Sequence, residues 1–252
     1  MKKNIREIIV PVFILIACLF TFYAVVYIFN YKVDEDKSVE KVKVIEKEKK
    51  EEVKEEPYVE PYVNNLPTFR NNYQNNNIMG IIEIPGVVNE ALVAKAGDNE
   101  YYLNRNLWNQ YDGIGAPFFD YRNSDLNNDR QVNIYGHNSQ NTAILDRLPL
   151  AKLMNYTDAN FFNTYKDLYL YTDTQKVHYE IIAIKIIQKS NNYHMTIHFY
   201  DDKDFLDHTN KLLEGSLNRR EATIKKTDRI LVLQTCNYNP PDTLALIICK
   251  TV

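Results

Sequence analysis

The sequence lacks an excess of charge of either sign. Its 252 residues include 30 basic and 33 acidic side chains, which leaves a net charge of −3. Proteins that hold nucleic acid through its phosphates carry a cationic field, so this composition argues against that class. Apolar residues make up 45% and aromatic residues 12% of the chain, and these contents exclude a disordered or collagen-like polypeptide.

Cysteine is also scarce, with three residues in the whole chain. Three cysteines cannot build a disulfide framework. A single bond between Cys236 and Cys249 would need Cα atoms within about 7 Å. If their strands form a hairpin around residues 239–242, the two cysteines lie at different distances from its turn, so we expect both thiols to be free. The carboxylates do not cluster at the spacing of metal ligands, and the sequence predicts no metal site and no cofactor.

One long apolar run lies near the N-terminus. Residues 8–29 contain no charged side chain, and at about 1.5 Å per residue they reach roughly 33 Å, enough to cross a hydrocarbon core of about 30 Å. Lys2, Lys3 and Arg6 precede this run, which places the N-terminus in the cytoplasm and the rest of the chain outside. A cleaved signal peptide would have a shorter apolar region and a small-x-small cleavage site. Residues 1–30 are therefore predicted to be a cytoplasmic tip and an uncleaved transmembrane anchor.

Residues 31–77 have the composition of a stalk. Charged residues of both signs dominate 32–56, and the few apolar residues among them do not repeat in the heptads of a coiled coil. Residues 57–77 are rich in Pro, Tyr and Asn. We expect a solvated spacer with some helix content.

Residues 78–252 have the size of one domain with its own core. Short runs of β-branched and aromatic residues are bounded by Gly, Pro, Asn or Asp, as at 81–84 and 230–233, and such runs are typical of strands. Two segments, 144–154 and 202–216, have helical patterns. Strands outnumber helices and the two do not alternate, so the pattern predicts a mainly β barrel or sandwich with inserted helices.

Cys236 and His137 are the residues best placed for chemistry. Each follows an apolar strand at its end, where a side chain reaches the rim of a sheet. A thiol needs a neighbouring base or charge to act as a nucleophile at neutral pH. The Thr235 hydroxyl and nearby backbone N–H groups could face a developing oxyanion. The other four histidines are expected at surface or packing positions; they are His178, His194, His198 and His208.

Two motifs at this spacing resemble a known family. Tyr135-Gly136-His137-Asn138 is followed about a hundred residues later by Leu233-Gln234-Thr235-Cys236, which is similar to the pattern of sortases, the membrane-anchored cysteine transpeptidases of Gram-positive bacteria. Further segments resemble class B sortases in particular: GIIEIP at 80–85, DNEYYL at 98–103, FFDYRN at 118–123 and the helical segment at 202–216. The resemblance covers residues 78–252, and the anchor and stalk fit the layout of the family.

The resemblance implies an eight-stranded sortase-type β-barrel with flanking helices. Cys236 would attack the carbonyl after the Thr of a C-terminal sorting signal, which in class B resembles Asn-Pro-x-Thr-Asn, and a thioacyl enzyme would form. An amine from a peptidoglycan precursor or a pilin subunit would then resolve it. His137 would act as general acid and base, with Thr235 and Asn138 supporting the substrate or the oxyanion. The resemblance further implies a single-pass protein of the cell membrane whose catalytic domain is extracellular, acts on secreted proteins and requires no calcium.

The sequence departs from the family at an arginine. Sortases carry it on the strand after the cysteine, which corresponds here to the neighbourhood of Leu244, yet no arginine follows Arg229. Val232 also replaces the first Thr of the family's cysteine motif.

Three explanations for the missing arginine stay open. Another donor could replace it, namely Thr243, Asn237 or Asn239. An arginine could reach the site from elsewhere: Arg122, Arg147, Arg219, Arg220 or Arg229. Finally, the chain could be a weakened, membrane-tethered module that binds sorting signals without processing them, since one oxyanion donor is worth about 10²–10³ in rate.

Overall fold

The computed structural model describes residues 18–32 and 62–252. The chain divides into two compact units, Met1–Glu60 and Pro61–Val252. In the first unit the described residues form one helix over 18–32 whose large apolar side chains, among them Phe20 and Phe29, are exposed. No helix among the described residues is both long enough and apolar enough to cross a membrane. The predicted anchor at 8–29 and the predicted stalk at 31–77 both lie partly outside the described residues.

The second unit begins earlier than the sequence indicated. Helix α2 (Leu66–Tyr73) falls within the predicted stalk, but its Leu66 is fully buried against Ile78 and Leu92. This contact joins α2 to the barrel, and the second compact unit, Pro61–Val252, includes the end of the predicted stalk.

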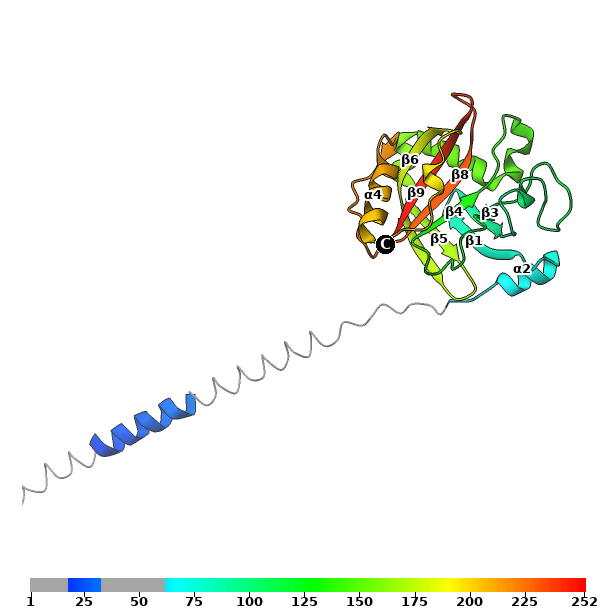
Figure 1. Cartoon of the computed structure of the whole chain (residues 1–252). Helices are drawn as coiled ribbons and strands as arrows, with labels where there is room; N and C mark the ends of the chain where they lie inside the picture. Colours follow the sequence, from blue (N-terminus) through cyan, green and yellow to red (C-terminus); the bar gives the residue numbers. More distant parts are fainter. Residues whose placement is uncertain (1–17, 33–61) are drawn as a thin grey trace, which may run out of the picture. The chain divides into compact units, whose positions relative to one another are not determined.

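Within residues 62–252 nine strands form one sheet, and eight of them close into a barrel (Figure 1). The strands are β1 (Ile78–Ile84), β2 (Val88–Ala94), β3 (Phe118–Phe119), β4 (Gln131–Tyr135), β5 (Asp167–Tyr171), β6 (Lys176–Gln188), β7 (Asn218–Arg219), β8 (Ile230–Asn237) and β9 (Thr243–Thr251). Their order is β5-β1-β2-β3-β4-β8-β9-β6-β7, and an additional pairing of β5 with β6 closes the ring. The short β7 pairs with Ala183 and Ile184 in the middle of β6, outside the ring. The predicted eight-stranded mainly β barrel is therefore confirmed.

Apolar side chains from all eight barrel strands fill the interior. On β8, Leu231 and Leu233 belong to this cluster, and β9 contributes Ile247 and Cys249. Because side chains alternate along a strand, the intervening residues of β8 and β9 face outward. Each fully buried aliphatic side chain contributes about 1.5–3 kcal/mol to folding.

Helices and 3₁₀ turns cover the barrel. Besides α2 they are η1 (Tyr101–Leu103), η2 (Thr142–Arg147), η3 (Pro149–Thr157), α3 (Ala159–Thr164), η4 (Tyr193–Met195) and α4 (Asp202–Leu213). The helical segment predicted at 144–154 falls in two 3₁₀ helices, η2 and η3, because Leu148, which precedes a proline, leaves the helical region with ψ 86°.

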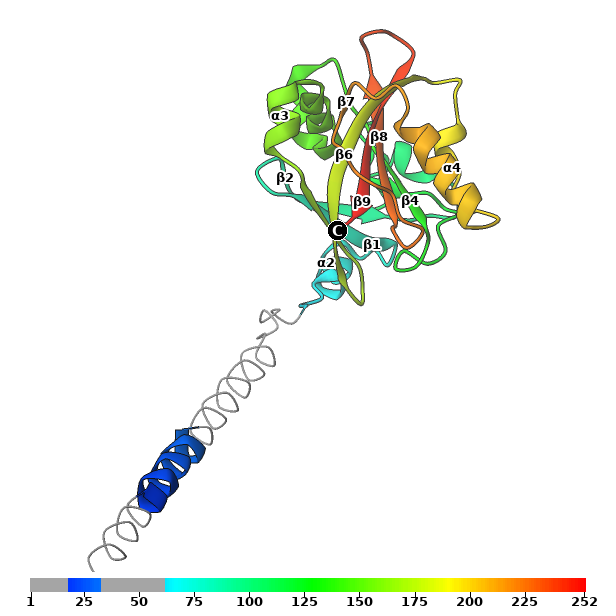
Figure 2. The same cartoon turned by 90° about the vertical axis from the view of Figure 1, so that its left-hand side faces the viewer.

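The segment predicted at 202–216 is helix α4 on the outer face of the barrel (Figure 2). The Asp201 side chain caps it by accepting a hydrogen bond from the Asp204 N–H. Phe205 and Leu212 are fully buried and join an outer cluster that includes Val232 of β8 and Leu246 of β9. Cys236 lies on the same outer face, near the end of β8 and next to this cluster.

Candidate active site

The pairing of β4 with β8 brings His137 and Cys236 together. The two strands are parallel, and Tyr135 lies opposite Gln234. His137 lies two residues after Tyr135, and Cys236 lies two residues after Gln234. The two side chains therefore occupy neighbouring positions on the same outer face. Cys236 is half-buried and packs against the outer apolar cluster. The structure thus brings together the two residues that the sequence singled out from segments a hundred positions apart.

The His137 ring and the Cys236 thiol perturb each other. The hydrogen bond to His137 lowers the pKa of the Cys236 thiol against the opposing effect of burial, and the charge of Lys189 lowers it further. The same hydrogen bond raises the pKa of His137 against burial. Both shifts favour the thiolate–imidazolium form, in which the sulfur is nucleophilic. Since the two groups interact, they titrate as a pair.

The Leu103 carbonyl fixes which ring nitrogen of His137 faces the thiol. His137 Nε2 lies 2.7 Å from the Leu103 carbonyl oxygen. A carbonyl oxygen can only accept, so Nε2 carries the proton and Nδ1 is left for Cys236. A backbone turn at Gly115 makes this arrangement possible. Gly115 has φ +66°, and a Cβ there would lie 2.4 Å from the Tyr102 carbonyl oxygen and 2.8 Å from that of Leu103.

Asn138 joins the ends of the two strands. Its Nδ2 donates to the Cys236 carbonyl oxygen at 2.9 Å, and the Tyr238 hydroxyl donates to the Asn138 carbonyl at 2.8 Å. Asn138 therefore holds the main chain at the nucleophile. Its predicted role in supporting the substrate or oxyanion stays a prediction.

Thr235 lies on the other side of the strand. It shares the interior face with Leu233, is 1% exposed and pairs with Ala245 of β9. Its hydroxyl is buried and has no hydrogen-bond partner among the described residues. The strand geometry points this hydroxyl away from the side of the thiol, and its predicted supporting role also stays a prediction.

The position expected for an arginine is occupied by Leu244, directly opposite Cys236. Two of the three side-chain donors that the sequence offered in its place, Asn237 and Thr243, are used within the hairpin turn. Asn237 Nδ2 donates to the Asn239 carbonyl and to Thr243 Oγ1, and Thr243 donates to the Pro240 carbonyl. These groups shape the β8–β9 turn.

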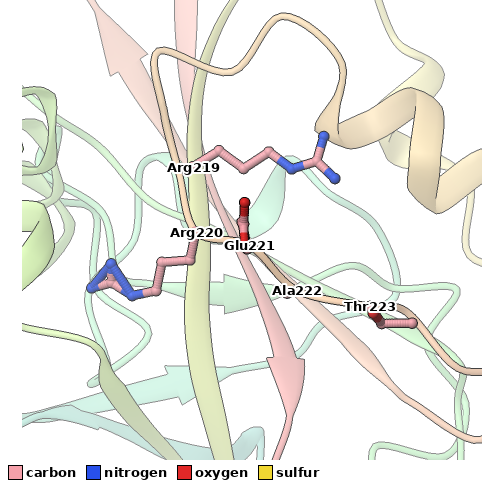
Figure 3. A pocket seen from close by; sticks show the side chains of 5 residues that line it. All are labelled: Arg219, Arg220, Glu221, Ala222 and Thr223. Atoms are coloured by element: carbon pink, nitrogen blue, oxygen red, sulfur yellow. The ribbon is translucent and has the colours of Figure 1, made fainter.

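Of the five candidate arginines, Arg122, Arg220 and Arg229 bind partners away from the thiol, and Arg219 is exposed. Arg122 binds Asp120 and the Met195 carbonyl, and Arg229 binds the carbonyls of Leu126 and Asp129. Figure 3 shows Arg219 and Arg220 pointing to opposite sides of a hollow of about 630 Å³ lined by Arg219, Arg220, Glu221, Ala222 and Thr223. The fifth, Arg147, pairs with Asp112 at 3.0 Å and lines a small hollow that also contains His137.

Lys189 is the residue near the thiol that the sequence did not reveal. It directly follows β6, where Ile187 lies opposite Leu244 and Gln188 opposite Thr243. The Lys189 N–H donates to the Asp242 carbonyl at 2.9 Å, which continues the ladder by one residue. The sequence shows only that a lysine follows an apolar strand. Its distance from the cysteine depends on the register of three strands, which the sequence does not give.

A buried polar network holds the loop between β6 and α4 over this face. His194 Nε2 lies 2.6 Å from Gln234 Oε1, and the His194 carbonyl accepts from Gln131 and Asn133 of β4. His208 Nε2 lies 3.0 Å from Gln131 Oε1. These two histidines pack within the structure, as expected from the sequence. Among the described residues no group of His, Cys, Asp and Glu is arranged to hold a metal ion.

Comparison with known proteins gives one consistent result. No protein-family model matches the chain. Sortase B of Listeria monocytogenes is 26% identical over 164 residues, a match that spans 65% of this chain and 64% of that protein. Sortase B of Staphylococcus aureus is 22% identical over 180 residues, 71% of each chain, and its complex with a substrate shares the fold with a TM-score of 0.63 over 74% of this chain and 85% of that one.

The structure of Clostridium perfringens sortase B is similar in both fold and sequence. It superposes with a TM-score of 0.67 at 26% identity, covering 74% of this chain and 99% of that one. The superposed share agrees with the length of the second compact unit, Pro61–Val252.

Proposed function

We propose that the chain is a class B sortase, a cysteine transpeptidase acting on a peptide sorting signal, on the basis of its similarity to the sortases B. The observation that carries the proposal is the position of His137 beside Cys236, with the pKa of the thiol lowered by their hydrogen bond. Because the pair lies at the rim of a closed barrel, the carbonyl of an extended peptide can approach the sulfur.

The proposed reaction has two halves. The Cys236 thiolate attacks the carbonyl carbon of the scissile peptide bond, the C–N bond breaks, and imidazolium at His137 donates its proton to the leaving amine. The peptide is then held as a thioester on Sγ. In the second half the neutral His137 ring accepts a proton from an acceptor amine as that amine attacks the thioester carbonyl. An amide bond forms, and the thiolate and imidazolium are restored.

We propose that the donor substrate is a secreted protein with a signal of the Asn-Pro-x-Thr-Asn type. The acceptor is the amine of a peptidoglycan precursor or of a pilin. Support comes from the class B resemblance and from the solved complex of Staphylococcus aureus sortase B with its substrate. A transpeptidase needs both a peptide carbonyl and an amine, which such partners supply.

We also propose that residues 8–29 anchor the chain in the cell membrane with the barrel outside. Two observations support this placement. In the described helix over 18–32, Leu19, Phe22 and Phe29 are 61–70% exposed, and basic residues precede the apolar run.

Mass spectrometry of the full chain with a sorting peptide tests the proposal. We expect a thioacyl adduct on Cys236, followed by transfer of the peptide to an added amine. The proposed enzyme activity is overturned if Cys236 forms no adduct with any class B-type peptide, or if the peptide binds and stays intact. The chain would then be a module that binds sorting signals without cleaving them.

A further inference from the structure

Lys189 and Cys236 share one face of the sheet across three adjacent strands. Cys236 of β8 lies opposite Leu244 of β9, which lies opposite Ile187 of β6. Ile187 and Leu244 belong to the outer apolar cluster against which Cys236 packs. Lys189 is two residues beyond Ile187 and still bonded to the β9 side through Asp242, so alternation gives it the same outward direction.

A lysine at this position can reach a substrate held on the thiol. Two strand spacings of about 4.8 Å and two residues of about 3.3 Å separate the two Cα atoms by roughly 12 Å. An extended lysine side chain covers about half of that separation, and the cysteine side chain with a bound carbonyl covers much of the rest. Lys189 is exposed, so its ammonium is free to turn toward Cys236 when a peptide occupies the face.

A cationic group that could stabilise an oxyanion is absent from the β9 position that lies opposite Cys236. Leu244 presents only methyl groups to Cys236 from the facing position. When a thiolate attacks a peptide carbonyl, the oxygen becomes an oxyanion, and a cationic donor near it lowers the barrier. His137 approaches from the β4 side and is occupied with the proton of the leaving group. On the side of the thiol that faces β9 and β6, Leu244 and Ile187 are the neighbours on the outer face, and Lys189 follows two residues beyond Ile187.

We infer that the Lys189 ammonium is the cationic group that binds the carbonyl oxygen of the sorting peptide and stabilises the oxyanion, in place of an arginine on β9. The inference rests on the proposed transpeptidase reaction. It is consistent with the electrostatic effect of Lys189 on the Cys236 thiol described above. A group that acts on the developing charge changes kcat more than KM.

The test compares three variants of the full chain. Lys189→Met keeps the length of the side chain and removes its charge, Lys189→Arg restores a cation, and Lys176→Met removes a lysine from the opposite end of the same strand. Cleavage of a sorting peptide gives kcat and KM. In parallel, the pH dependence of Cys236 alkylation by iodoacetamide, read by peptide mapping, reports on the thiol without any substrate.

We expect Lys189→Met to lower kcat by about 10²-fold with little change in KM and to move the alkylation midpoint to higher pH. Lys189→Arg should recover most of both losses, and Lys176→Met should behave as the parent chain. The inference is overturned if Lys189→Met leaves kcat unchanged, or if Lys189→Arg is as impaired as Lys189→Met.

Two further outcomes separate this inference from competing ones. A loss in Arg147→Met that Lys189→Met does not show would assign the role to the arginine beside His137 and overturn it for Lys189. If the parent chain cleaves no sorting peptide, the proposed transpeptidase fails. The alkylation profile then still decides for or against Lys189, since an unchanged midpoint in Lys189→Met would overturn its action on the thiol.

Discussion

Cys236 and Cys249 are the same chemical group in two opposite environments of one hairpin. Cys236 lies on the outer face near the end of β8, half-buried beside His137, and its pKa is lowered mainly by that hydrogen bond. Cys249 lies on the inner face of β9 opposite Leu231, is fully buried, and burial alone raises its pKa far above the ordinary value. The difference teaches that face and neighbours, rather than residue type, decide whether a thiol reacts or packs.

Substituting each cysteine by alanine gives the largest contrast. Cys236→Ala removes the sulfur that forms the thioester, so we expect complete loss of peptide cleavage. Cys249→Ala is the matched control: it removes one buried atom from the core, and the rate should stay close to that of the parent chain. Cleavage that persists in Cys236→Ala would place the nucleophile elsewhere.

His137→Gln breaks the electrostatic half of the comparison. The pKa of the Cys236 thiol is depressed by His137, so below that pKa the thiol is protonated and inert, and removing the ring shifts the onset of reactivity to higher pH. Cleavage should fall by about 10²–10⁴-fold because the general acid and base is gone. Alkylation of Cys236 measured against pH checks the direction, and a midpoint that moves to lower pH would contradict it.

In the parent chain the same pair predicts a bell-shaped pH–rate profile. The rate rises as Cys236 loses its proton, at a pH below that of an ordinary thiol. It falls again as His137 loses its proton, at a pH above the usual histidine value of 6.5. His137→Gln should abolish the alkaline limb, and a profile that keeps rising with pH in the parent chain would argue against an imidazolium in catalysis.

Cys249→Ser sharpens the packing half of the comparison. A hydroxyl in this fully buried position loses its bonds to water, so we expect the free energy of unfolding to fall by about 1–3 kcal/mol. Urea denaturation measures the change, with Cys249→Ala as the control for lost volume. Equal stability of Cys249→Ser and the parent chain would show that the inner face at this position is not dry.

Asn138→Ala has the smallest expected effect. It removes the 2.9 Å hydrogen bond to the Cys236 carbonyl, which is worth about 0.5–1.5 kcal/mol, so kcat should drop by no more than about tenfold. The pH profile of Cys236 alkylation should not move, because Asn138 contacts the main chain and not the sulfur. A shifted profile would instead assign Asn138 a direct role at the thiol.

The barrel and the His137–Cys236 pair could be predicted because both depend on patterns of neighbouring residues in the sequence. Strand-like runs end at each of these residues, and the family resemblance supplied the number of strands. The order of the strands then places the pair on adjacent parallel strands, as the structure shows.

The sequence could not predict features that depend on contacts between distant segments. The Leu103 carbonyl that orients His137 is held by a turn 12 residues further along the chain, at Gly115. Lys189 reaches the outer face of Cys236 only through the register of β6, β9 and β8. The sequence pattern assigns helix α2 to the stalk because its residues are largely polar and Leu66 is its one fully buried side chain.

The parallel pairing of β4 with β8 also bears on how far such a sequence can diverge. The spacing of His137 and Cys236 is set by the main-chain hydrogen bonds that join residues 131–135 of β4 to residues 230–234 of β8. Peptide groups are common to all residues, so the side chains between these points can be exchanged without separating the reacting atoms. The same register lets a cationic group reach the outer face from β6, as we infer for Lys189, while β9 presents Leu244 beside the thiol.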